Sequence, residues 1–199
     1  MKFRIALIAA VLAAGMVAAP AQAGWRLVKK DEPREVARSN VIVTPTEDWN
    51  RSTQRPTKRA ELWTREGMQL TDLGFYMGIK DGEALFKRRQ EKRNPMPEFD
   101  SDMLPTDIVE WYEDTANVVL GGSLFEITEV RPAKFAGYDG VHFAFSYTGG
   151  DNVERLGEVR AAIIDERLYL ISFDAPKLYY FDRYISGVRV LMDSAQIKR

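Results

Sequence analysis

The stretch Ala161-Ala-Ile-Ile-Asp-Glu-Arg-Leu-Tyr-Leu-Ile-Ser-Phe173 decides the predicted fold. Two runs of aliphatic and aromatic residues flank Asp165-Glu166, a pattern typical of two antiparallel strands joined by a tight turn. The apolar residues in these runs do not alternate cleanly with polar ones, which indicates strands covered on both faces. The stretch therefore predicts a sheet with other structure on each side.

Further strands are predicted on both sides of this hairpin. They are runs of β-branched and aromatic residues bounded by glycine, proline and other turn formers. The loop from Trp49 to Arg59 separates the first two strands, and the early part reads as a β-meander. The predicted strands outside the hairpin are Ser39–Pro45, Ala60–Thr64, Asp72–Ile79, Leu124–Val130, Val141–Tyr147 and the start of Val153–Ile164.

Two amphipathic helices are predicted to cover the sheet. The first begins at Pro105 and stops at Gly121-Gly122, and the second begins with Asp174 as a cap and Pro176 in its first turn. The stripe of the second helix is Leu178, Phe181, Ile185, Val188, Met192 and Ala195. We therefore predict an α+β fold, a central, mostly antiparallel sheet of about six to seven strands covered by helices on both faces.

The first 23 residues have the pattern of a cleavable export signal. Lys2 and Arg4 precede an apolar run too short to span a bilayer, and Ala21-Gln22-Ala23 suits signal peptidase. We expect a periplasmic or secreted protein that begins near Gly24 and has no transmembrane segment after cleavage. Residues 24–38 are predicted to be an extended N-terminal segment, and 39–199 a single domain.

Composition excludes several kinds of chemistry. There is no cysteine, so disulfides, thiol catalysis and lipid attachment at a cysteine are excluded. His142 is the only histidine, and we interpret it as a half-buried strand residue bonded to a neighbour, with a catalytic base as the alternative. Neither a metal site nor a cofactor is predicted, because no set of ligands has a recognisable spacing.

The order of these elements resembles the PsbP-like α/β/α sandwich superfamily, which includes PsbP, Mog-type and DcrB-type bacterial envelope proteins. The residues that carry the resemblance are the strand that ends at Pro45 with Trp49 after it, the turn from Trp63-Thr64 to Gly67, the segment Leu168–Phe173 and the ending Met192-Asp-Ser-Ala195. The resemblance implies a scaffold that binds other proteins or assists assemblies. It transfers no functional residue.

The strongest local feature is a basic cluster that we call the basic segment, comprising Lys87, Arg88, Arg89, Lys92 and Arg93. Prolines at 95 and 97 place it in a loop. Such a segment either docks an anionic envelope component or an acidic protein patch, or is merely solvated. Nucleic acid is not expected as a partner, because removing Lys2 and Arg4 reduces 28 basic residues to 26 against 29 acidic ones.

Two tryptophans and several acidic pairs are weaker candidates. Trp49 and Trp63 sit beside turns and are the candidates for an exposed aromatic pair, although packing in the core is the simpler interpretation. Asp100 with Asp102 lacks the rest of a calcium loop, and Glu113 with Asp114 gives no evidence of a catalytic pair.

The function predicted from these observations is that of an exported, non-enzymatic accessory or binding protein. Its partner would be an envelope protein or an anionic envelope component. Two alternatives stay open: a carboxylate-dependent hydrolase of an envelope polymer, and a carrier of a small molecule or lipid that holds its ligand between sheet and helix.

Overall fold

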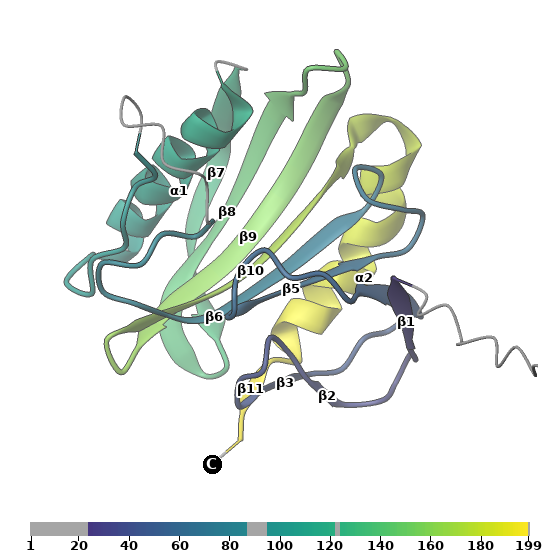
Figure 1. The fold of residues 1–199 in the computed structure, drawn as a ribbon, viewed down its shortest axis with the longest axis horizontal. Helices are drawn as coiled ribbons and strands as arrows, with labels where there is room; N and C mark the ends of the chain where they lie inside the picture. The colour runs from purple at the N-terminus through teal and green to yellow at the C-terminus, as the bar shows by residue number, and fades with distance from the viewer. Residues whose placement is uncertain (1–23, 87–94, 122–123, 199) are drawn as a thin grey trace, which may run out of the picture.

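A computed structural model describes residues 24–86, 95–121 and 124–198, so the predicted export signal lies outside the described residues. The main feature is an eight-stranded antiparallel sheet (Figure 1). In spatial order its strands are β1 (Trp25–Val28), β4 (Trp49–Ser52), β5 (Ala60–Thr64), β6 (Asp72–Lys80), β10 (Arg167–Pro176), β9 (Glu154–Ile164), β8 (Tyr138–Thr148) and β7 (Phe125–Phe135).

The hairpin predicted from Ala161–Phe173 is confirmed and lies inside this sheet. It is formed by β9 and β10, with Arg167 opposite Ile164. Asp165 and Glu166 have φ values of 50° and 58°, as a two-residue turn between twisted strands requires. Each strand of the hairpin has another neighbour, because β6 pairs with β10 and β8 pairs with β9.

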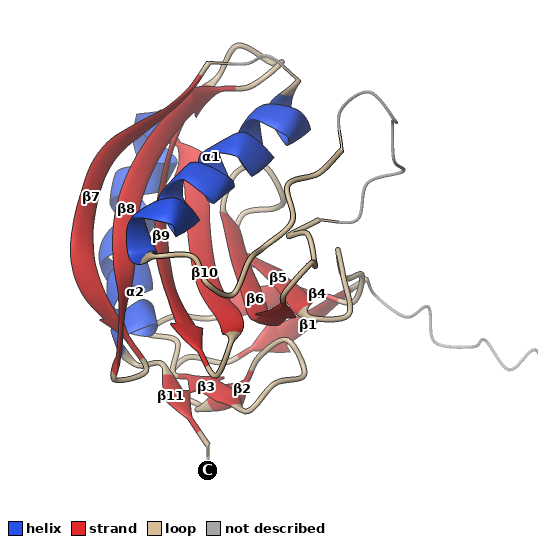
Figure 2. Ribbon diagram, turned by 90° about the vertical axis from the view of Figure 1, so that its left-hand side faces the viewer, coloured by secondary structure: helices blue, strands red, loops and turns tan. Residues whose placement is uncertain are grey.

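Two helices and a small second sheet complete the described fold. The helices are α1 (Pro105–Leu120) and α2 (Asp182–Asp193), with a π-helical turn, η1 (Lys177–Phe181), before α2. The small sheet has the order β11 (Gln196–Ile197), β3 (Val41–Val43) and β2 (Arg34–Glu35). Figure 2 shows α1 and α2 on opposite faces of the main sheet. Within the described ranges, neither helix has the length and apolarity to span a bilayer.

The predicted fold class is wrong: the structure is mostly sheet, not a sandwich of six to seven strands covered by helices. Eight strands are about 34 Å wide at the usual strand spacing. The 16 residues of α1 and the 12 of α2 span about 24 and 18 Å. Two helices are too short to cover such a sheet, so other segments share the task. Strands were missed at Trp25–Val28, Arg34–Glu35, Trp49–Ser52 and Gln196–Ile197.

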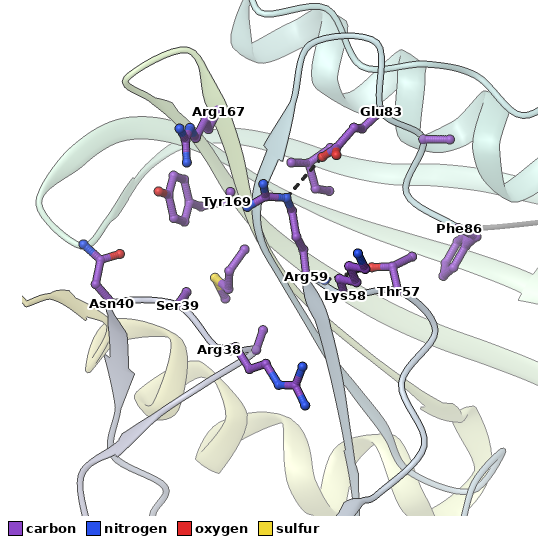
Figure 3. A pocket seen from close by; sticks show the side chains of 15 residues that line it. Arg38, Ser39, Asn40, Thr57, Lys58, Arg59, Glu83, Phe86, Arg167 and Tyr169 are labelled. Atoms are coloured by element: carbon purple, nitrogen blue, oxygen red, sulfur yellow. Dashed lines mark hydrogen bonds and ion pairs between the residues drawn. The ribbon is translucent and has the colours of Figure 1, made fainter.

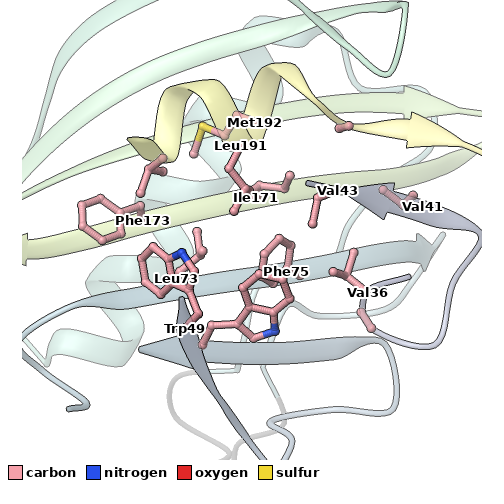
Figure 4. Packing of buried hydrophobic residues seen from close by; sticks show 14 of the residues in the cluster. Val36, Val41, Val43, Trp49, Leu73, Phe75, Ile171, Phe173, Leu191 and Met192 are labelled. Atoms are coloured by element: carbon pink, nitrogen blue, oxygen red, sulfur yellow. The ribbon is translucent and has the colours of Figure 1, made fainter. Parts of the chain in front are cut away.

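The sheet separates two apolar cores. On the α1 face, Val141, Phe143 and Phe145 of β8 pack with Ile108 and Trp111 of the helix. On the other face, α2 and the small sheet pack together against the main sheet (Figure 4). Val36, Val41, Val43, Trp49, Leu73, Phe75, Ile171, Phe173, Leu191 and Met192 belong to this second core.

The two predicted helices differ in how well the sequence located them. Helix α1 begins at Pro105 as predicted, and Gly121 ends it with a left-handed φ of 65°. The second helix begins later than predicted, because β10 continues through Asp174 to Pro176. Leu178, which we placed on the buried stripe, is 86% exposed, since η1 interrupts the helical period at Leu178 and Tyr179.

Candidate functional site

A groove of about 680 Å³ lies between the turn that joins β2 to β3, the loop before β5 and the β6 and β10 strands (Figure 3). We call it the basic groove. Among the described residues, its charged lining consists of four cations and one acid: Arg38, Lys58, Arg59, Arg167 and Glu83. The remaining lining includes the polar residues Ser39, Asn40 and Thr57 and the apolar or aromatic residues Met77, Ile79, Phe86 and Tyr169.

A tight turn places Arg38 at the groove. Ala37 and Arg38 have φ values of 52° and 54°, and the Ser39 amide donates to the Val36 carbonyl over 3.0 Å. The Ala37 amide also donates to Glu61 Oε2 over 3.3 Å, and this carboxylate is buried beneath the turn. Two successive left-handed residues other than glycine cost conformational energy. The strained turn is therefore the segment that holds Arg38 at the basic groove.

The positive charge of the groove is only partly compensated. Arg59 Nε lies 3.2 Å from Glu83 Oε2, which neutralises one of the four cations. Arg38, Lys58 and Arg167 are exposed, and none of them has an ion pair with another residue of the described ranges. Three cations around one concavity attract anions more strongly than the same charges spread over a convex surface. The groove is therefore suited to an anionic group.

The apolar side of the groove adds a second kind of contact. Tyr169 of β10 is partly exposed, and so is Phe86 at the other end of the groove (Figure 3), whereas Met77 and Ile79 of β6 are buried. Gly78, between Met77 and Ile79, has a φ of 72°, and an added Cβ would lie 3.4 Å from Arg59 Nη1. A side chain at this position would be strained by the positive φ, and its Cβ would contact Arg59.

The basic segment predicted from sequence, Lys87, Arg88, Arg89, Lys92 and Arg93, lies outside the described residues. It follows Phe86 directly in the sequence. Phe86 itself lines the basic groove. The basic segment therefore adjoins the basic groove along the chain. Of the two, only the basic segment was predicted from the sequence.

The two tryptophans proposed as an exposed pair are both in the core. Trp49 is 3% exposed and Trp63 is 0% exposed. Trp63 Nε1 donates a hydrogen bond to Glu61 Oε1 over 2.9 Å, and Arg51 and Arg55 lie 3.4 and 3.3 Å from Glu61 Oε2. An exposed aromatic site at these positions is therefore wrong, because both rings are needed to fill the space beneath the sheet.

His142 is bonded to a neighbour, as predicted, but is fully buried and not half-buried. Its Nε2 lies 3.3 Å from Glu158 Oε2, and Arg189 Nε donates to the same oxygen over 3.0 Å. Burial alone would raise the pKa of Glu158, but the bonds from His142 and Arg189 outweigh it and lower the pKa to about 2. The arrangement is an ionic network in which His142 and Glu158 are buried and Arg189 is half exposed.

The other acidic candidates are parts of local structure. Asp100 Oδ1 accepts from the Asp102 amide over 2.8 Å, which closes a turn before α1. Glu113 and Asp114 are successive residues of α1 and point in different directions from its axis. Across the described residues, no group of three potential ligands is placed to hold a metal ion.

Sequence reasoning missed Arg38, Lys58, Arg59 and Arg167 as a set. The density of arginine in the loop that ends at Arg59 was the only signal. It gave no reason to connect that loop with Arg38 or with Arg167, which is more than a hundred residues further along the chain.

No family model and no curated protein matches the sequence. Among solved structures, the chain is similar to the solution structure of cyanobacterial PsbP from Synechocystis sp. PCC 6803. The TM-score is 0.52 and the identity 12%, over 88% of this chain and 93% of that chain. It also aligns with LpqN, involved in cell envelope biogenesis of Mycobacterium tuberculosis, with a TM-score of 0.37 and 13% identity over 88% and 79% of the two chains.

The likeness to cyanobacterial PsbP shows a PsbP-like fold, so the resemblance inferred from the sequence is confirmed. At 12% identity the likeness concerns the fold alone, because unrelated functions occur on a shared fold. The alignment with LpqN is too distant to support an argument. Function must therefore be argued from the side chains of this protein.

Proposed function

We propose that this protein is an exported, non-enzymatic binding protein that holds an acidic segment of a partner protein in the basic groove. One observation carries the proposal: Arg38, Lys58 and Arg167 surround one concavity, and no acidic residue of the described ranges pairs with them. Export is inferred from residues 1–23, whose charges and cleavage pattern are those of a signal peptide.

The mixed lining favours a peptide over a purely anionic polymer. The partly exposed rings of Phe86 and Tyr169 offer apolar contact beside the cations, and a polymer that carries only anionic and hydroxyl groups would leave these rings unused. A flat membrane surface also fits a concave groove poorly. An extended segment that alternates acidic with apolar side chains satisfies both parts of the lining.

The basic segment is proposed to extend the same surface. Its five cations would attract the partner electrostatically, at about 1 kcal/mol per basic residue near a strongly charged surface. Salt screens such attraction. Removal of the basic segment is therefore expected to lower the association rate and to weaken the salt dependence of binding. Substitutions in the basic groove are instead expected to reduce affinity at every salt concentration.

The hydrolase alternative is less well supported. Hydrolysis of a glycosidic bond requires two carboxyl groups on either side of the scissile bond. The partly buried acids that share a cavity, Asp72 and Asp174, are instead neighbours on adjacent strands and project from the same face of the sheet. The basic groove contains a single carboxylate, Glu83, which is paired with Arg59.

The proposal is tested with a fluorescein-labelled peptide of alternating glutamate and leucine and with the same peptide carrying glutamine for glutamate. The glutamate peptide is expected to bind, and the glutamine peptide at least tenfold more weakly. The double variant Arg38→Glu, Arg167→Glu is expected to lose at least tenfold in affinity. The matched control, Arg26→Glu with Lys30→Glu, makes the same change in net charge on exposed residues outside the groove.

A photo-crosslinking residue at Asn40, compared with one at exposed Val190, then identifies the occupant in intact cells. We expect a protease-sensitive adduct from Asn40 alone, which disappears in the Arg38→Glu, Arg167→Glu background. Equal peptide binding by the groove variant and the control, or an adduct that consists of polymer or lipid, would contradict the proposal.

A further inference from the structure

A second cavity, of about 280 Å³, lies between α1 and the main sheet, on the face that Figure 2 shows in front. We call it the α1 cavity. Aromatic rings from different elements line it: Tyr76 from β6, Tyr112 from α1, Phe125 from β7, and Phe145 and Tyr147 from β8. Its volume is at the small end of the range for ligand sites, so its ligand must be small.

Two carboxyl groups lie side by side in this cavity. Asp72 and Asp174 are direct partners in the register of β6 and β10, and both line the cavity. The Tyr147 hydroxyl donates to Asp174 Oδ2 over 2.7 Å, and the backbone amide of Gln69 donates to Asp72 Oδ1 over 2.8 Å. Each carboxyl group therefore has a second oxygen for which no hydrogen bond is found within the described part of the chain.

No basic side chain of the described residues lines the cavity to balance these acids. The nearest influence is that of Arg155, but its guanidinium donates to both oxygens of Asp151, over 2.9 and 2.7 Å. Burial raises the pKa of Asp72 to about 6. Burial and the charge of Asp72 together raise the pKa of Asp174 to about 7. Among the described residues, the two acids therefore have no cation beside them in the cavity.

An unsatisfied hydroxyl group on the helix side gives independent evidence for a ligand. Thr115 is 1% exposed and lines the α1 cavity, and its Oγ1 has no hydrogen-bond partner in the described structure. Buried polar atoms without partners are rare in native proteins and call for an explanation. A donor that enters the cavity from the mouth would satisfy this oxygen and the carboxyl groups together.

We propose that the α1 cavity binds the ammonium group of a small organic amine between Asp72, Asp174 and Thr115. An ammonium group carries three donors, and these suit the two carboxylates and the threonine hydroxyl. The rings of Tyr76, Tyr112 and Phe145 line the cavity, and aromatic rings attract a cation that has left water. The apolar tail of the amine lies toward Met68 and Val119, which are exposed at the rim of the cavity.

The pH dependence follows from the groups that face the carboxyl pair. These are the phenols Tyr76, Tyr112 and Tyr147, whose pKa values burial raises further above neutrality, and Arg155, which stays charged. Within the physiological range only Asp72 and Asp174 change charge. The amine binds the ionised pair, so its affinity rises with pH and binding releases protons.

The test uses 2-phenylethylamine as the probe and 2-phenylethanol as its uncharged counterpart, both measured by calorimetry with the whole mature chain. We expect the amine to bind at least tenfold more tightly than the alcohol, and at least tenfold more tightly at pH 8 than at pH 5. The apparent enthalpy should differ between phosphate and Tris buffers, because protons are released.

Four variants and one control test where the amine binds. Asp174→Asn and Asp72→Asn should each weaken amine binding at least tenfold, and Thr115→Val about threefold. Ala116→Met keeps every charge but fills the cavity, and it should weaken the amine and the alcohol alike. Asp114→Asn removes one exposed acid from the same helix and should leave binding unchanged.

Near-ultraviolet circular dichroism of each variant verifies that it folds. Amine binding that Asp174→Asn and Ala116→Met both leave intact, or no preference for the amine over the alcohol, would overturn the assignment. The basic groove contributes no residue to this cavity apart from Phe86, so failure here leaves the proposed peptide site untouched.

Discussion

Asp72 and Asp174 face each other across β6 and β10, with both carboxyl groups in the cavity beneath α1. Like charges directly opposite each other in an antiparallel pair destabilise a sheet. The protein tolerates the pair because burial keeps a proton on it until the pH approaches neutrality: the pKa is about 6 for Asp72 and about 7 for Asp174. The pair is therefore a source of pH-dependent stability as well as a candidate cation site.

The first prediction concerns the pH dependence of unfolding. The pKa of Asp174 is raised from 3.8 to about 7 in the folded protein, so the folded state holds a proton that the unfolded state releases. Its contribution to stability is complete below pH 4 and is lost as the pH rises through 7. Asp174→Asn should therefore raise the free energy of unfolding by about 2 kcal/mol at pH 8 and change little at pH 4.

Urea unfolding at both pH values measures this difference, with Asp114→Asn as the control, which should show no such pH dependence. If the free energy of unfolding of Asp174→Asn at pH 8 equals that of the unchanged protein, the carboxyl pair ionises without a cost in stability.

The second prediction concerns the network of Glu158, His142 and Arg189. The pKa of Glu158 is lowered to about 2, so this carboxylate contributes stability that is present above pH 4.5 and is lost as the pH falls through 2. Glu158→Gln should lower the free energy of unfolding by about 2 kcal/mol at pH 7, because a buried ionic network loses its central charge.

The two proteins should become equally stable near pH 2, and guanidinium unfolding across the pH range measures the convergence. Glu126→Gln, at an exposed position of β7, is the matched control and should be neutral within about 0.5 kcal/mol. A deficit of the same size at every pH would assign the effect to packing and not to charge.

The third prediction separates the charge of Arg38 from its backbone strain. Arg38→Gly relieves a left-handed φ of 54° and should raise the free energy of unfolding by about 1 kcal/mol, while the affinity for the acidic peptide falls. Arg38→Ala removes the same charge but keeps the strain, so it should lose affinity without gaining stability. Equal stabilities of the two variants in thermal unfolding would show that this turn is unstrained.

The fourth prediction tests the place of the tryptophans. Trp63→Leu should lower the free energy of unfolding by about 3 kcal/mol, because it leaves a cavity and removes the 2.9 Å hydrogen bond to Glu61. Trp25→Leu, at a position that is 40% exposed, should cost less than about 1 kcal/mol. Comparable losses in urea unfolding would mean that the ring of Trp63 is not part of the core.

Local patterns predicted the elements that follow one clear rule. The strand Ala60–Thr64 was predicted with the bounds that the structure has, and α1 begins at Pro105, where proline and an early acid favour a helix start. The prediction was wrong where a helical pattern overlapped the end of a strand. Leu178 fits a helical stripe, but the long β10 strand continues to Pro176 and leaves Leu178 at a non-helical turn.

The sequence by itself determined the central hairpin, the start of α1 and the absence of cysteine chemistry, because turn residues, helix-start residues and composition can be read from the chain itself. Only the tertiary structure decided that Arg38, Arg59 and Arg167 share a groove and that Asp72 opposes Asp174. Those relationships join residues far apart in sequence. Strand order and register bring them together, and no local period encodes either one.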